Sequence, residues 1–145
     1  RFDEGFIHED ETFTTLLYCA ARRAISLEAV LFRRRIRPGS TMTRPRAWEH
    51  VVGCIQSAKQ IGRASAEGMA PLSPACRETL RSRQRTLLRQ ALVNAALSGT
   101  SARLTRLLAS RFDARDIFRI DPLILPFALW CNLLRLFSLL RSKTV

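Results

Sequence analysis

Apolar residues recur at helical spacing along most of the chain. A first helix is predicted where Phe13, Leu16 and Ala20 follow a group of acids, because residues three and four apart share one helix face. Similar apolar stripes predict helices over residues 45–63, 74–98 and 101–111. The pattern therefore predicts a mainly α chain.

The ends of the helix over residues 74–98 have local signals of their own. Ser73 before Pro74 fits an N-cap followed by proline at the first helical position. Gly99 can take the left-handed conformation that commonly ends a helix. These signals fix both ends of the longest predicted helix.

One stretch departs from the helical pattern. Residues 29–36 carry Val30, Phe32 and Ile36 among arginines, which predicts a short β-strand. The expected fold is therefore mainly α, with one strand element near the start and a helical extension over residues 44–145.

The most apolar part of the chain covers residues 122–140. Pro126 and Arg135 interrupt it, so it falls short of the roughly 20 apolar residues that a membrane-spanning helix needs. Packing against the other helices is the favoured interpretation. The alternative is a helix in the membrane interface, with Trp130 and Phe137 inserted.

Carboxylates cluster at the start of the first predicted helix, in the run His8-Glu9-Asp10-Glu11. One interpretation is structural, because unpaired backbone N–H groups and the positive end of the helix dipole favour acids there. The other is chemical, because an exposed carboxylate can accept a proton from a substrate hydroxyl. The surrounding motifs decide between them.

Three motifs occur in a familiar order: the Glu9-Asp10 pair opening a helix, the strand-like residues 30–36, and the turn Arg37-Pro38-Gly39-Ser40. Residues 2–43 thereby resemble the end of the catalytic domain in family 2 glycosyltransferases of the GT-A fold. The resemblance implies inverting transfer of a sugar from a nucleotide-sugar donor to an acceptor hydroxyl in surface polysaccharide synthesis. The acceptor would be a glycan or a lipid-linked glycan.

The resemblance also assigns residues to roles. Asp10 matches the aspartate that acts as general base in that family, and His8 and Glu9 flank it as acceptor-binding residues. Arg37 and Ser40, in the turn, are expected to contact donor phosphates or the acceptor.

The family's donor-binding features do not occur in this sequence. The family holds Mg²⁺ or Mn²⁺ through an Asp-x-Asp motif, which Asp3-Glu4 does not match. We therefore expect a division into residues 1–43, the C-terminal fragment of a catalytic domain, and residues 44–145, a helical extension. We also expect the chain to be inactive without a donor-binding half.

Composition adds one alternative. Lys and Arg number 24 against 12 Asp and Glu, for a net charge of +12, and Arg77, Arg81, Arg85 and Arg89 share one helix face. Such a ridge suits an anionic membrane surface or nucleic acid, although a solvated face is the simpler interpretation. Nucleic acid is disfavoured, because the acidic start repels phosphate and no nucleic-acid-binding motif is present.

Cysteine spacing and the N-terminal residues bear on compartment. The four cysteines are far apart and form no C-x-x-C pair, which predicts reduced thiols and no metal site. No secretory signal pattern opens the sequence. The expected location is the cytoplasm, with peripheral attachment at the inner face of the cell membrane as an extension of that expectation.

Overall fold

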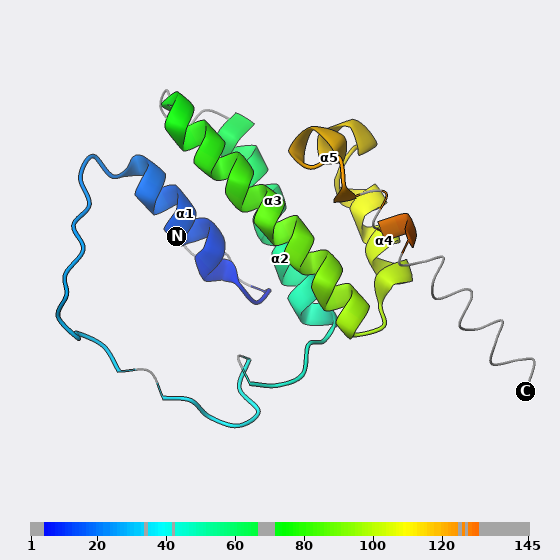
Figure 1. Ribbon diagram of the computed structural model, residues 1–145, viewed down its shortest axis with the longest axis horizontal. Helices are drawn as coiled ribbons and strands as arrows, with labels where there is room; N and C mark the ends of the chain where they lie inside the picture. The colour runs from blue at the N-terminus through cyan, green and yellow to red at the C-terminus, as the bar shows by residue number, and fades with distance from the viewer. Residues whose placement is uncertain are drawn as a thin grey trace, which may run out of the picture.

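Helices α2 (Trp48–Ala66) and α3 (Pro74–Leu97) pair lengthwise at the centre of the molecule. The computed structural model describes residues 5–33, 35–41, 43–66, 72–124, 126 and 128–130. Figure 1 shows α1 (Glu9–Ala20) on one side of the central pair, with α4 (Ser101–Arg111) and α5 (Ala114–Ile120) on the other. The predicted mainly α fold is confirmed.

The predicted apolar stripes form the core between α2 and α3. The fully buried residues of α2 repeat at helical spacing, and those of α3 face them. The buried apolar set comprises Val51, Cys54, Ile55, Ala58 and Ile61 of α2 and Leu80, Leu87, Leu88, Ala91, Leu92 and Ala95 of α3. Burying apolar surface stabilises by about 25 cal/mol per Å², so this pairing is the main source of stability.

Both predicted end signals of α3 are present. The Ser73 hydroxyl accepts a hydrogen bond from the Cys76 N–H at 3.2 Å. Gly99 has a φ of 66°, and the Thr100 N–H reaches back to the Ala95 carbonyl at 2.8 Å. This left-handed cap turns the chain directly into α4.

Helix α1 approaches α2 through its backbone. A Cβ added to Gly53 of α2 would lie 2.3 Å from the carbonyl oxygen of Ile7, so only glycine permits this contact. The Ser57 hydroxyl donates to the His8 carbonyl at 3.0 Å, and the Thr12 hydroxyl donates to Gln60 at 2.9 Å. The start of α1 is thus fixed to α2 by polar contacts.

The arginine ridge of α3 does more than face solvent. Arg85 donates to the Ile120 carbonyl at 3.0 Å, and Arg89 forms a 2.5 Å ion pair with Asp121. Asp121 is 2% exposed, and burial alone would raise the pKa of its carboxyl group. The hydrogen bonds from Arg89 and the Leu123 N–H outweigh burial, so the pKa is lowered. Two ridge arginines therefore anchor the end of α5.

The segment between α1 and α2 leaves the bundle as a long exposed excursion (Figure 1). The strand predicted over residues 29–36 is not formed: its described residues are irregular, with Val30 84% exposed and Phe32 79% exposed. A strand needs a neighbour for its backbone hydrogen bonds, and the described residues provide none here.

Most of the apolar stretch 122–140 lies outside the described residues. Of its described part, Ile124 and Ala128 are buried in the core, whereas Leu129 and Trp130 are exposed. The start of this stretch thus packs against the bundle, as the favoured interpretation predicts. Among the described residues, no helix combines the length and the hydropathy needed to cross a membrane.

Replacing Gly53 with alanine should displace α1. A helical Gly→Ala change ordinarily stabilises by about 1 kcal/mol, but here the methyl group would collide with the Ile7 carbonyl. We expect Gly53→Ala to lower the free energy of unfolding by about 1–3 kcal/mol, measured by urea denaturation. Gln56→Ala on the same helix is the control. The contact would be contradicted if Gly53→Ala lowered the free energy of unfolding by no more than Gln56→Ala does.

Candidate functional site

The acidic run lies at the first turn of α1, as predicted. His8 precedes the helix with a φ of 71°, a left-handed conformation that is uncommon for residues other than glycine. Its carbonyl accepts the Glu11 N–H at 3.1 Å, which closes the first turn. Glu9 and Asp10 are exposed on this turn.

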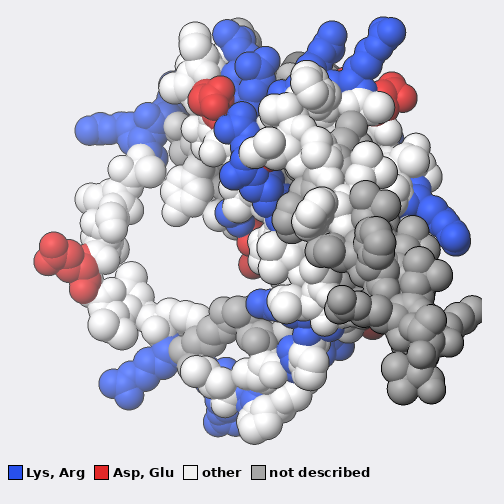
Figure 2. All heavy atoms as spheres, turned by 45° about the vertical axis from the view of Figure 1, so that its right-hand side comes forward, with Lys and Arg blue, Asp and Glu red and all other residues white. Residues whose placement is uncertain are grey.

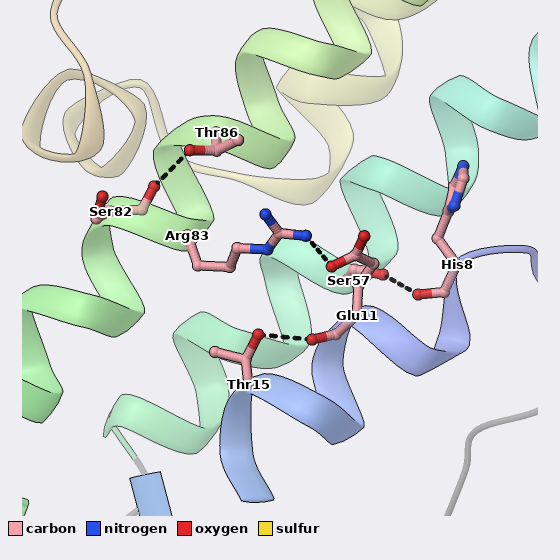
Figure 3. A network of polar contacts seen from close by, with 7 residues as sticks. All are labelled: His8, Glu11, Thr15, Ser57, Ser82, Arg83 and Thr86. Atoms are coloured by element: carbon pink, nitrogen blue, oxygen red, sulfur yellow. Dashed lines mark hydrogen bonds and ion pairs between the residues drawn. The ribbon is translucent and has the colours of Figure 1, made fainter. Parts of the chain in front are cut away.

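The three acids differ in their contacts. The Glu11 carboxylate forms an ion pair with Arg83 of α3, drawn in Figure 3. The side chains of Glu9 and Asp10 make no hydrogen bond or ion pair within the described part of the chain. Glu11 therefore holds α1 to α3, while Asp10 stays available to an external molecule.

His50 connects two segments that are distant in sequence. It is fully buried, and its ring centroid lies 5.8 Å from that of His8. Its Nδ1 accepts the Ala47 N–H at 3.2 Å, which leaves Nε2 to carry the proton and donate to the Thr41 carbonyl at 3.3 Å. His50 thus links the turn that contains Arg37 to the segment that begins α1.

The turn of residues 37–43 is held by its own hydrogen bonds. Gly39 has a φ of 73°, the Ser40 N–H donates to the Arg37 carbonyl at 3.3 Å, and the Thr43 hydroxyl donates to the same carbonyl at 2.7 Å. The Ser40 hydroxyl lies 3.1 Å from the Thr43 hydroxyl. The Arg37 side chain is exposed, so of the two predicted contact residues Arg37 is the less constrained.

Burial shifts the pKa values of two groups in the corner where the start of α1, near His8, meets α2, near His50. Desolvation, followed by the charge of His50, lowers the pKa of His8, against the opposing effect of Glu11 and Asp10. The buried Nε2 of His8 has no hydrogen-bond partner among the residues that the structure describes. Burial and the charge of Glu11 raise the pKa of Cys54 to about 11, so this thiol is protonated at neutral pH and is a poor nucleophile.

The sequence prediction missed two residues of this corner. His50 is fully buried against the ring of His8, and no local sequence pattern indicates this contact. Arg83 belongs to the helix that carries the ridge, and nothing in sequence links it to Glu11. The His50–His8 and Arg83–Glu11 contacts are both tertiary contacts between elements far apart in the chain.

The residues described here do not form a metal site. They contain no group of three or more His, Cys, Asp or Glu side chains placed to bind one ion. Asp3 and Glu4 lie outside the described residues. The Mg²⁺ or Mn²⁺ expected for the whole enzyme therefore has no ligand set in this corner. Cys19, Cys54 and Cys76 carry no disulfide, and Cys131 is not described.

Comparison of the chain with protein-family models, with curated proteins and with solved structures finds no match. Function is therefore inferred from the motifs and from the geometry of this corner.

The pH dependence of stability should report the burial of His8. Because its pKa is lowered in the folded state, the unfolded chain binds the extra proton first as the pH falls below about 6.5. The contribution of His8 to the free energy of unfolding is thus complete above that pH. It is lost as the pH falls toward the lower pKa that His8 has in the folded state. His50, Glu11, Asp10 and Arg46 are the charged or titratable groups that act on it.

We expect His8→Asn to reduce the slope of thermal midpoint against pH between 7.5 and 5. Asparagine tolerates the left-handed conformation and does not titrate in this range. Circular dichroism melts at several pH values provide the measurement. An unchanged slope would show that His8 titrates normally.

Proposed function

We propose that this chain forms the acceptor side of an inverting family 2 glycosyltransferase of the GT-A fold, with Asp10 as general base. The single observation that best supports this is the state of Asp10: exposed, on the first turn of α1, and without a side-chain partner among the described residues. A purely structural acid at this position would be expected to resemble Glu11, whose carboxylate is engaged by Arg83.

In the proposed reaction, the acceptor hydroxyl attacks the anomeric carbon of the donor sugar. The hydroxyl proton passes to the Asp10 carboxylate as the new C–O bond forms, and the nucleotide leaves with the electron pair of the broken bond. The fixed first turn of α1 supports this role, because a general base must lie within hydrogen-bond reach of the proton that it takes. Glu11 and Arg83 would set this geometry without touching substrate.

The other predicted residues take supporting roles in the proposal. Glu9, exposed beside Asp10, would contact acceptor hydroxyl groups, and His8 would fix the entry to the helix as well as line the acceptor side. Arg37 would contact donor phosphate or acceptor, because its side chain is exposed and has no ion pair with any described residue. The link from Thr41 through His50 toward His8 supports placing this turn and the acidic run in one site.

The proposal also gives residues 29–36 a partner. In a complete GT-A domain this segment would add as a strand to the central sheet, which would cover side chains such as Val30 and Ile36, now 84% and 80% exposed. The donor-binding half and its divalent metal would come from residues other than those described here. The partners would be a nucleotide sugar and a glycan or lipid-linked acceptor, with the enzyme in the cytoplasm or at the inner membrane face.

The alternative, an arginine-rich module for membrane surfaces or nucleic acid, has less support. Of the four ridge arginines, Arg85 and Arg89 bind the end of α5, and Arg77 donates to the Leu72 carbonyl at 2.9 Å. A continuous cationic track along α3 would need these groups to face the polyanion.

Asp10→Asn tests the proposed base in the polypeptide that carries a complete catalytic domain with this segment. We expect sugar transfer to fall by about 10²–10⁴-fold, with donor binding unchanged, since the amide cannot accept the proton. Radiolabelled sugar transfer and donor titration provide the two measurements.

Glu9→Gln is the matched control, because it removes the neighbouring charge from the same turn and should act mainly on the KM for acceptor. Full turnover by the Asp10 variant would remove that residue from the mechanism. Comparable losses in both variants would indicate a general charge effect rather than a base.

A further inference from the structure

A hollow lies on the side of the molecule away from α1. Its walls come from the end of α2, the first half of α3, the end of α4 and helix α5, and its volume is about 800 Å³. Figure 1 shows α1 on the opposite side of the central helix pair. The hollow is therefore separate from the corner that contains Asp10, and inferences about it do not depend on the proposed glycosyl transfer.

The floor of this hollow is built by close packing. The Gln84 side chain lies across Gly62, where an added Cβ would come within 2.4 Å of its Nε2 atom. That nitrogen donates to the Ala58 carbonyl at 2.9 Å, and the residue is 8% exposed. The half-buried Phe112 and Ile120 add apolar surface from the other wall. The base is thus fixed before any ligand binds.

The rim of the hollow is strongly cationic. Five basic side chains from four helices line it, namely Lys59, Arg63, Arg81, Arg111 and Arg119. None of them makes a hydrogen bond or an ion pair through its side chain in the described part of the chain. Two carboxylates, Asp113 and Asp116, line the same space and leave three net positive charges.

The arrangement suits a small anion better than a polymer. Pockets for small molecules have volumes of roughly 300–1,000 Å³, and this one falls within that range. Basic groups from four helices converge on one space, whereas a nucleic acid needs a track of charges along its backbone. Figure 2, turned to bring the α4 and α5 side forward, shows basic atoms outnumbering acidic ones on the visible face.

The mixed charge narrows the class of ligand. Guanidinium groups bind phosphate oxygens through paired hydrogen bonds, and several around one space favour more than one phosphate charge. Asp113 and Asp116 would repel phosphate but accept hydrogen bonds from hydroxyl groups. A ligand with a phosphorylated end and a hydroxyl-bearing end would suit both the basic side chains and the two carboxylates of the hollow.

We propose that the hollow between α2, α3, α4 and α5 is a binding site for an organic diphosphate that also carries hydroxyl groups, such as a nucleoside diphosphate. The same phosphate chemistry occurs in free metabolites and in lipid headgroups. The experiment separates these two sources.

Isothermal titration of this chain with UDP, inorganic pyrophosphate and uridine tests the site. UDP should bind with a stoichiometry of one, pyrophosphate more weakly, and uridine not detectably. Arg119→Glu and Arg81→Glu should each weaken UDP binding by about tenfold or more, since each replaces a charged hydrogen-bond donor by a repelling carboxylate.

Arg115→Glu is the matched control, because Arg115 is exposed on the same short helix as Arg119 but does not line the hollow. It makes the same change in net charge and should leave UDP binding within about twofold of the unaltered chain, as expected for a distant, screened charge. All three arginines are exposed, so unfolding is not expected, and thermal melts check this.

Vesicles distinguish the lipid source. Phosphatidylcholine vesicles with and without phosphatidylinositol 4,5-bisphosphate, whose headgroup carries several phosphates and free hydroxyl groups, are sedimented with the same variants. Binding to the vesicles with phosphatidylinositol 4,5-bisphosphate alone, weakened by Arg119→Glu and not by Arg115→Glu, would support the site and assign it to a headgroup. UDP binding with the same variant pattern would support it and assign it to a free ligand. Equal losses for Arg119→Glu and Arg115→Glu, or no saturable binding to any probe, would overturn the proposal.

Discussion

The contact between the Ile7 carbonyl and Gly53 is the constraint on which the acidic corner depends. Any side chain on Gly53 would meet the backbone of the segment before α1. That approach permits the Ser57 hydroxyl to bind the His8 carbonyl and brings the His8 ring to His50. The orientation of Asp10 therefore follows from the absence of one Cβ atom on a neighbouring helix.

The two faces of the central helix pair use arginine in different ways. Arg83 pairs with Glu11 and holds α1, and Arg85 and Arg89 hold the end of α5. Five basic side chains that have no partner in the described part of the chain line the hollow beside α5. Arginine is suited to both settings, because a guanidinium group can donate a hydrogen bond to a carbonyl and can pair through two hydrogen bonds with a carboxylate or a phosphate.

The sequence predicted the helices well because their signals are local. The Ser73-Pro74 cap, the Gly99 turn and the stripe around Ile55 each depend on residues a few positions apart. The contacts of His50 and Arg83 could not be predicted, since they join separate elements. The strand expected near Val30 carries the right local pattern, yet β-structure also requires a partner strand, which the described residues do not provide.

The exposed excursion between α1 and α2 has a consequence for handling the chain. Ile25, Val30, Leu31, Phe32 and Ile36 are between 76% and 87% exposed, in a backbone whose amide groups are largely unpaired. Such a segment is a template for intermolecular β-pairing, and the arginines between its apolar residues oppose that pairing by charge repulsion. Aggregation should therefore increase with ionic strength, because salt screens the repulsion between arginines but does not weaken the association of the exposed apolar side chains.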